Sequence, residues 1–388
     1  MPFTKVADPD VLPAGSGYGV AFTADGTLLV VGHADTPFVT VYKQAGGVFT
    51  KFADPNYLPT SDGYGAAITS DGAYLAVVSF ASPRIWIYYH GWGKSGETIQ
   101  LCACPDVLPA GSGYIAAFTS DGAYLAVAHE FSPYVTIYKE TMGFHNKLAD
   151  PNVLPAGLAY GVAITSDGTY LAVAHLVSPF VTIYKRAGDT FTKLANPDVL
   201  PAGSGYGAAI TSDGTYLAVA HENSPFVTIY KRAGDAFTKL ANPDVLPPGI
   251  ANAVAFTSDG TYLAVGHDVT PMITIYERAG DAFTKLANPD ELPPGGGKGL
   301  SFTSDGTYLA VGHYVSPYVT IYENPASAST PDAVPAPAPV STPAPVSLGR
   351  PLKYGLKTPL KREPLNVRWE CQLDWKEPRQ DISSRKRR

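Results

Sequence analysis

The 388-residue sequence has little charge, little sulfur and no long hydrophobic run. Charged residues make up 16% of the chain, below the ~25% of an average soluble protein. Three cysteines, Cys102, Cys104 and Cys371, are too few to indicate a disulfide scaffold. No apolar run reaches the ~18 residues of a membrane span, and the opening Met-Pro-Phe-Thr-Lys lacks the apolar core of a secretory signal. We therefore expect a protein made in a cytoplasm and without a membrane span.

Glycine (38 residues), proline (35) and tyrosine (24) are abundant instead. Turn formers combined with aromatic and β-branched residues favour an all-β fold. Charge is divided unevenly. Residues 350–388 hold twelve lysines and arginines against five acidic residues, a net charge of +7, whereas the whole chain has −6, so the remainder carries −13. An acidic body with a basic end indicates two separate roles.

Internal repeats dominate the chain. The dipeptide Asp-Gly recurs seven times, in steps of 46 residues with one step of 50, at Asp25, Asp71, Asp121, Asp167, Asp213, Asp259 and Asp305. One unit reads as four short strands, at 208–211, 216–221, 226–231 and 237–240, joined by turns at 212–214 and 233–235 and by the Ser-Pro break at 224–225. Four antiparallel strands in about 46 residues match one propeller blade.

The two ends of the repeat region predict how the ring closes. The last unit, from Gly299 to Tyr322, has only three strands, whereas residues 3–13 (FTKVADPDVLP) copy the fourth-strand text FTKLANPDVLP. The N-terminal strand should therefore complete the seventh blade and close the ring. We predict a seven-bladed β-propeller over residues 1–324, a Pro/Ala-rich linker over 325–348 and a basic extended arm over 349–388.

The texts TSDGTYLAVAH (211–221) and VTIYKRAGD (227–235) resemble the WD-repeat and related seven-bladed propellers. The resemblance covers residues 3–324. It departs where that family keeps Trp-Asp, because the third strand here ends Ile-Tyr-Lys, as at Tyr184 and Tyr230, and the family's Gly-His is missing. The connection LANPDVLPAG (194–203) is similar to that of propellers found in virion proteins of tailed phages. This second resemblance implies a structural protein of a phage particle.

The linker and arm differ from the repeats in composition. A Pro/Ala segment would form a semi-rigid spacer of ~3 Å per residue. In the arm, residues 366–375 alternate strictly between apolar and polar, which predicts one strand. We expect it to join the sheet edge of another protein, or to fold back onto its own propeller. The predicted anchor residues are Val367, Trp369, Cys371, Leu373 and Trp375, followed by Arg385, Lys386, Arg387 and Arg388. The basic end suits solvent or an acidic protein better than nucleic acid, for which no motif is present.

Two rings of side chains are predicted at one rim of the propeller, because the loop into the first strand and the loop after the second share an end. Six blades place a histidine eight residues after the turn aspartate, and blade two has Ser79 instead. The histidines could bind a metal, but equivalent residues on a circle converge poorly, so hydrogen bonds to nearby loops are expected. The second ring could bind sugars or polar groups, or simply pack. The candidate ligand rim is Tyr18, Tyr64, Tyr114, Tyr160, Tyr206, His129, His175, His221, His267 and His313, with His33 in blade one and with Asn252 and Lys298 ending the tyrosine series.

No catalytic constellation emerges from the sequence. The turn aspartates repeat in equivalent environments, which does not divide acid from base. Gly-Ser-Gly-Tyr-Gly at 15–19 and 203–207 lacks the lysine of a phosphate-binding loop, and Cys102-Ala103-Cys104 has no second cysteine pair. We predict a protein that is not an enzyme and uses no metal or other cofactor.

The leading hypothesis is a virion structural protein: a propeller displayed on a phage head or tail, anchored by its arm to other virion proteins. Its near-equivalent blades could bind a host-surface glycan or protein by avidity. One alternative is a lactonase-like or quinoprotein-like propeller enzyme that uses the rim histidines. Another is an intracellular scaffold that binds peptides on one face.

Overall fold

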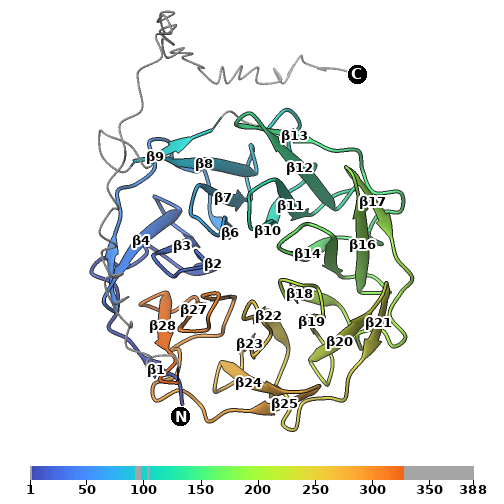
Figure 1. The fold of residues 1–388 in the computed structure, drawn as a ribbon. Helices are drawn as coiled ribbons and strands as arrows, with labels where there is room; N and C mark the ends of the chain where they lie inside the picture. The colour runs from blue at the N-terminus through green and yellow to red at the C-terminus, as the bar shows by residue number, and fades with distance from the viewer. Residues whose placement is uncertain (1, 92–97, 103–104, 327–388) are drawn as a thin grey trace, which may run out of the picture. The chain divides into compact units, whose positions relative to one another are not determined.

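The computed structural model describes residues 2–91, 98–102 and 105–326. The arm and nearly all of the predicted linker, with Trp369, Trp375 and the terminal arginines, lie outside these residues. The described residues form seven four-stranded antiparallel sheets arranged in a ring (Figure 1). No helix among them is long and apolar enough to cross a membrane. The prediction of an all-β, seven-bladed propeller is confirmed.

Each blade is built in the same order from the centre outwards. The innermost strands are β2 (Gly17–Phe22), β6 (Gly63–Ile68), β10 (Gly113–Phe118), β14 (Ala159–Ile164), β18 (Gly205–Ile210), β22 (Ala251–Phe256) and β26 (Gly299–Phe302). The second strands are β3 (Leu28–His33), β7 (Tyr74–Ser79), β11 (Tyr124–His129), β15 (Tyr170–His175), β19 (Tyr216–His221), β23 (Tyr262–His267) and β27 (Tyr308–Gly312).

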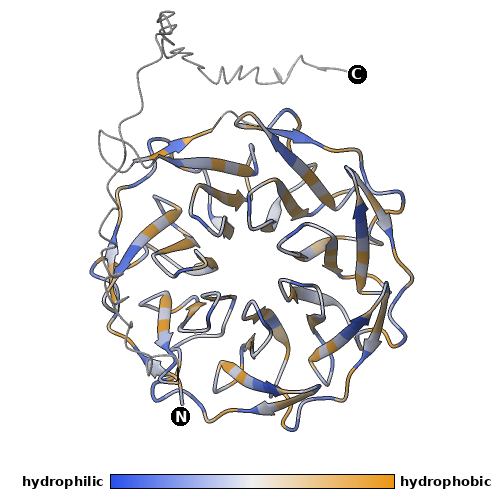
Figure 2. Cartoon of the chain, viewed as in Figure 1, coloured by the Kyte–Doolittle hydropathy of each residue, from blue (hydrophilic) through white to orange (hydrophobic). Residues whose placement is uncertain are grey.

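The outer half of each blade follows the same scheme. The third strands are β4 (Val39–Ala45), β8 (Ile85–Gly91), β12 (Val135–Thr141), β16 (Val181–Ala187), β20 (Val227–Ala233), β24 (Ile273–Ala279) and β28 (Val319–Glu323). The outermost strands are β5 (Val48–Lys51), β9 (Thr98–Leu101), β13 (Phe144–Lys147), β17 (Thr190–Lys193), β21 (Ala236–Lys239), β25 (Ala282–Lys285) and β1 (Thr4–Lys5). Figure 2 shows apolar residues along these strands, and neighbouring blades pack through them into buried clusters.

The ring closes as the ends of the repeat region predict. Strand β1 pairs antiparallel with β28, with Thr4 opposite Glu323 and Lys5 opposite Tyr322. Phe3, only 1% exposed, packs edge-to-face against the rings of Tyr262 and Phe302. The N-terminal strand is therefore the outer strand of blade seven.

The two ends of the propeller differ. The pairing of Gly205 with His221 places the start of each first strand beside the end of the second. We call this the tyrosine end; it also carries the connections between blades and the loops between second and third strands. The Asp-Gly turns and the turns between third and fourth strands lie at the opposite, polar end. Because third strands run from the tyrosine end to the polar end, the chain leaves β28 at the polar end.

The turn aspartates fix the Asp-Gly hairpins, as expected. The hydroxyl of Thr211 and the amide of Thr215 both donate to the Asp213 carboxylate, at 2.8 Å each. Gly214 adopts φ 71°, a conformation that favours glycine. Burial opposes ionisation of Asp213, but the threonine hydrogen bonds outweigh it and lower the pKa of the carboxyl. These carboxylates are structural.

A tyrosine at the centre of each third strand ties the blade to the incoming connection. The ring of Tyr230 is fully buried, and its hydroxyl donates to the Val199 carbonyl at 2.8 Å. The same bond recurs in other blades, for instance from Tyr184 to Val153. In blade two the hydroxyl of Tyr88 is buried and has no hydrogen-bond partner in the described part of the chain. Sequence reasoning noted these tyrosines only as a departure from Trp-Asp.

The Tyr230 hydroxyl has a hydrogen-bond acceptor and the Tyr88 hydroxyl has none among the described residues, so removing each should have a different effect on stability. Tyr230→Phe should lower the free energy of unfolding by about 1–2 kcal/mol, because it leaves the buried Val199 carbonyl without its donor. Tyr88→Phe should be neutral or stabilising. It removes a buried hydroxyl that has no hydrogen-bond partner among the described residues. Urea unfolding of both variants checks this. Equal destabilisation by the two substitutions would contradict the hydrogen-bond account.

Candidate binding face

Five tyrosines form a continuous arc around the channel at the tyrosine end. Ring centroids of consecutive members lie 4.9, 6.3, 4.4 and 5.7 Å apart, in the order Tyr18, Tyr64, Tyr114, Tyr160 and Tyr206. All five are half-buried. The predicted tyrosine ring is thus a contact network spanning blades one to five, and Asn252 and Lys298 occupy its remaining positions.

Close packing of the innermost strands brings these rings together. A Cβ atom on Gly65 would lie 2.6 Å from the Tyr114 carbonyl oxygen and 2.8 Å from the Ile115 Cα. No side chain fits there without moving backbone. Gly65, which follows Tyr64 in β6, is therefore required because the backbone of β10 in the next blade approaches so closely.

The structure revises the histidine half of the predicted rim. Its five members and His33 are all fully buried, so their imidazoles lie beneath the rim surface. In each, Nε2 lies within hydrogen-bonding distance of a threonine on the third strand, as for His221 and Thr228 at 2.8 Å. In blades one and six, Nδ1 also reaches a loop carbonyl, 2.8 Å from His33 to Ala34 and 2.7 Å from His267 to Val269. Each of these histidines therefore ties the second strand to the third, and in blades one and six also holds a loop.

Burial keeps these imidazoles neutral. It lowers the pKa of His129, His175, His221 and His313 to about 4 in each case. No group of three or more His, Cys, Asp or Glu side chains able to hold a metal occurs in the part of the chain that the structure describes. Burial likewise raises the pKa of the Cys102 thiol to about 12, which disfavours the reactive thiolate. Its predicted companion Cys104 lies outside the described residues.

Exposed apolar side chains gather at the tyrosine end. Among the described residues, only four large exposed apolar side chains lie elsewhere, on the outer hairpins of blades one to three: Val48, Tyr89, Met142 and Phe144. The others stand on loops and connections of the tyrosine end, and include Val11, Leu12, Tyr57, Phe80, Val107, Phe131, Val153, Leu154, Val177, Val199, Val245, Leu246, Ile250, Val269, Leu292, Tyr314 and Val315. Apolar surface gathered on one face is typical of a binding surface.

Acidic side chains lie among these aromatic groups. Asp62, Glu130 and Glu222 form no ion pair with the described residues, and Glu130 accepts a hydrogen bond from the Ser112 hydroxyl at 3.1 Å. Burial, followed by neighbouring tyrosines and these carboxylates, raises the pKa of Tyr64 and Tyr206 and brings that of Tyr114 to about 12. The mouth is aromatic and negatively charged.

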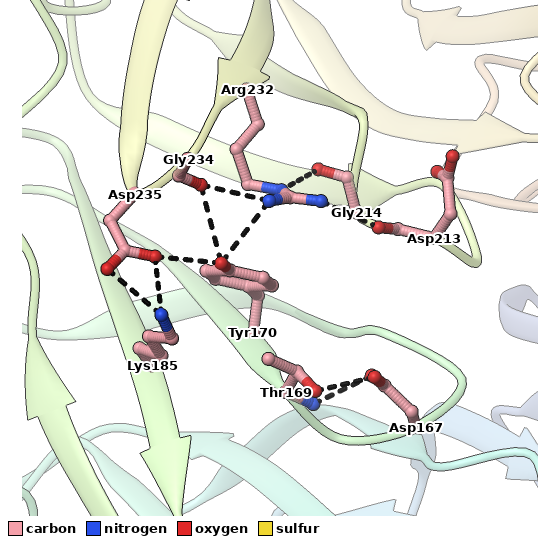
Figure 3. A network of polar contacts seen from close by, with 9 residues as sticks. All are labelled: Asp167, Thr169, Tyr170, Lys185, Asp213, Gly214, Arg232, Gly234 and Asp235. Atoms are coloured by element: carbon pink, nitrogen blue, oxygen red, sulfur yellow. Dashed lines mark hydrogen bonds and ion pairs between the residues drawn. The ribbon is translucent and has the colours of Figure 1, made fainter.

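The polar end is held by a repeated clamp between blades (Figure 3). The Arg232 guanidinium lies 4.4 Å from the centroid of the Tyr170 ring and donates to the carbonyls of Gly214 and Gly234 at 2.8 and 2.9 Å. The Tyr170 hydroxyl donates to Asp235, which also pairs with Lys185 at 2.8 Å. Equivalent clamps use Arg186 on Tyr124 and Arg278 on Tyr216. The polar groups of this end are largely bonded to one another.

We expect Arg232→Lys to lower the free energy of unfolding by about 1–2 kcal/mol, because lysine cannot reproduce the forked hydrogen bonds or the stacking on Tyr170. Thermal unfolding of the variant measures this. Gln44 stands at the same position in blade one, where its amide donates to the Tyr308 hydroxyl at 3.2 Å without a guanidinium fork. Gln44→Lys is the matched control and should cost less than Arg232→Lys, because lysine can still supply one donor. A neutral result for Arg232→Lys would show that the clamp contributes no net stability.

The innermost strands end around the central channel at the polar end. A serine collar surrounds it, formed by Ala24, Ser70, Ser120, Ser166, Ser212, Ser258 and Ser304. Backbone hydrogen bonds link neighbours, for example from Ser120 to Ser166 at 3.1 Å and from Ser304 to Ala24 at 3.0 Å. With a ring of phenylalanines and isoleucines it lines a cavity of about 200 Å³. The collar joins the blades at the centre.

Comparison with known proteins identifies the fold alone. No family model matches the chain, and no curated protein matches it. Solved structures do: hydrazine synthase of Kuenenia stuttgartiensis has a TM-score of 0.61 at 18% identity, with 82% of this chain and 99% of that chain covered. The Cps50 (Swd1) β-propeller domain of Myceliophteria thermophila has a TM-score of 0.60 at 15% identity, with coverage of 81% and 98%. The chain is a seven-bladed, WD-repeat-like β-propeller. It shares this fold with hydrazine synthase and with the Cps50 (Swd1) propeller domain.

Proposed function

We propose that this protein is a non-enzymatic binding propeller whose working surface is the tyrosine end. The observation that carries the proposal is the set of exposed apolar side chains on the loops and connections of that end, among them Phe80, whose ring lies 6.4 Å from that of the arc tyrosine Tyr64. At the polar end, lysine–aspartate pairs join neighbouring blades, as between Lys185 and Asp235 and between Lys231 and Asp281. A surface that must stay in water gains nothing from exposed Phe80 and Phe131, whereas a partner would bury them.

We further propose that the propeller belongs to a tailed-phage virion and is held there by residues 349–388. The similarity of the blade connections to phage propellers and the charge of +7 in residues 350–388 support this. The chain leaves β28 at the polar end, opposite the tyrosine end. A Pro/Ala linker of 24 residues can span about 70 Å when extended.

The partner of the tyrosine end, in this proposal, is a protein or glycan of the host surface. Weak contacts suffice, because many copies on one particle raise the overall affinity. The rim histidines have no catalytic role in the proposal, since their imidazoles are buried and hydrogen-bonded to threonines. Metal analysis and an absorbance spectrum of the purified protein would reveal the bound group that the enzyme alternative requires.

Surface substitutions test the working face. Phe80→Ser and Phe131→Ser together should reduce attachment of particles to host cells at least tenfold. Both side chains are more than half exposed, at 58% and 55%, so the fold should tolerate the change. Met142→Ser, at a 91% exposed position near the polar end, is the matched control. Attachment that survives the double substitution would refute the working-face assignment.

Truncation tests the anchor. A protein ending at residue 348 should fold with an unchanged thermal midpoint and fail to join the particle. A peptide of residues 349–388 should in turn capture a capsid or tail protein from purified, dissociated particles. Incorporation of the truncated protein into particles at the normal copy number would overturn the anchoring role.

A further inference from the structure

We infer that the tyrosine end recognises lysine or arginine side chains presented by an extended segment of a partner protein. This inference rests on the proposed function, since it specifies the chemistry of the partner at the same face. It follows from the charge of the mouth, from its aromatic groups and from an internal lysine that the mouth already holds.

The internal lysine shows how this face accommodates a cation. Lys298 stands where five other blades have the arc tyrosine. Its ammonium pairs with the Asp268 carboxylate at 2.9 Å and lies 5.6 Å from the centroid of the Tyr314 ring. Asp268 directly follows the rim histidine of blade six, and Tyr314 directly follows that of blade seven. A carboxylate and an aromatic ring on neighbouring loops thus hold an ammonium group together.

The same carboxylate position is acidic in two further blades, where no lysine of the chain occupies it. Glu130 and Glu222 each follow a rim histidine, as Asp268 does, and neither forms an ion pair with the described residues. Glu130 precedes the exposed Phe131 and contributes to the raised pKa of Tyr114. The ring that Tyr314 supplies to Lys298 is replaced by Leu176 beside Glu130 and by Asp268 beside Glu222. An incoming ammonium or guanidinium group would instead find each carboxylate near an arc tyrosine, Tyr114 for Glu130 and Tyr206 for Glu222.

Blade two supplies a second such patch. The centroid of the Phe80 ring lies 6.4 Å from that of Tyr64. The negative charge of Asp62 contributes to the raised pKa of the same tyrosine. Arg84, the cation of this loop, donates to the Pro109 carbonyl at 3.2 Å. Blades two and three therefore present two carboxylates beside exposed aromatic rings, which suits a segment with cationic and apolar side chains.

A glycan fits these observations less well. Sugars stack on open aromatic faces, but the arc tyrosines pack against one another at 4.4 to 6.3 Å. A neutral sugar would also leave the carboxylates of Asp62, Glu130 and Glu222 without a counter-charge. A basic segment satisfies both the charge and the exposed phenylalanines.

Peptide binding to the full chain tests the inference. The probe is a labelled nine-residue peptide with lysine, leucine and serine repeated three times, and its counterpart has glutamate for lysine. We expect the lysine peptide to bind at least tenfold tighter in low salt, with the preference falling as salt rises. The combined variant Asp62→Asn, Glu130→Gln, Glu222→Gln should lose about tenfold, from a few-fold per exposed ion pair.

Two further variants make the test specific. Glu277→Gln removes an exposed carboxylate at the polar end and should change binding less than twofold. Lys298→Met frees Asp268 from its internal cation and should strengthen binding about threefold. Equal binding of the two peptides, or full binding by the triple variant with an unchanged thermal midpoint, would overturn the inference. If host attachment fails in Phe80→Ser, Phe131→Ser but persists in the triple variant, the working face stands and the basic partner does not.

Discussion

The propeller should lose stability steeply as the pH falls from 6.5 toward 4. Four rim histidines, His129, His175, His221 and His313, have a folded pKa of about 4, because their imidazoles are buried. In the unfolded chain each should titrate near the ordinary value of about 6.5. Between these values the unfolded state binds more protons, so acid favours it.

The size of the effect follows from proton linkage. A lowered pKa of a base means that its stabilising contribution is complete above pH 6.5 and is lost as the pH falls toward the folded pKa. Each histidine then contributes a slope of about 1.4 kcal/mol per pH unit, and the four together about 5 kcal/mol per pH unit. Two pH units then remove about 10 kcal/mol, which is comparable with the 5–15 kcal/mol by which folded proteins are stable. Despite partial burial, hydrogen bonds from threonines lower the pKa of five turn aspartates, so these groups do not contribute in this window: Asp25, Asp167, Asp213, Asp259 and Asp305.

Urea unfolding at a series of pH values measures this slope. His175→Ser copies the residue that blade two has in Ser79, and it should reduce the slope by about a quarter of the rim contribution. Its stability at pH 7 should fall as well, because the bond to Thr182 is lost. Histidine resonances that titrate near pH 6.5 in the folded protein would contradict the prediction.

Replacing Phe3 with alanine should destabilise the propeller by about 3–5 kcal/mol, although the residue stands near the start of the chain. Phe3 fills the core between blades six and seven, where it contacts Tyr262 and Phe302. Its strand is short: Thr4 and Lys5 pair with β28, and the Val6 amide adds a hydrogen bond to the Ile321 carbonyl at 3.0 Å. The aromatic side chain therefore holds the closing strand in place.

Thr4→Ala is the matched control for this substitution, because Thr4 is exposed on the same strand. It should change the free energy of unfolding by less than about 0.5 kcal/mol. Thermal and urea unfolding of the two variants test the comparison, and hydrogen exchange of β28 should quicken in Phe3→Ala alone. A small effect of Phe3→Ala would mean that the ring is stable without its closing strand.

The fold could be predicted from the sequence because repetition carries most of the information. Seven Asp-Gly turns at near-constant spacing predicted the number of blades. The copy of the fourth-strand sequence at residues 3–13 predicted that the N-terminal strand closes the ring. Both depend only on local patterns and on the need to cover sheet edges. Each was confirmed by the strand order.

The site was predicted less completely, because position on a circle does not determine burial. The pattern placed the histidines at the end of the second strand, but their side chains turn inward to threonines such as Thr228, seven residues away on the next strand. The bond from Tyr230 to Val199 joins residues 31 apart and has no local signature. The pairing of Lys298 with Asp268 likewise depends on which loops meet between two blades.

In the proposed attachment through residues 349–388, the propeller is held through a strand that is paired on both sides. Strand β28 lies between β27 and β1, since the N-terminal strand takes the outer position. In that proposal, a load between a partner at the tyrosine end and the attachment that follows β28 acts along β28. Its hydrogen bonds run across the strand, so they resist such a load together, in shear. Were β28 the edge of its sheet, only one row of bonds would resist. The closure of the ring by β1 thus also raises the force that β28 can bear before it separates from its sheet.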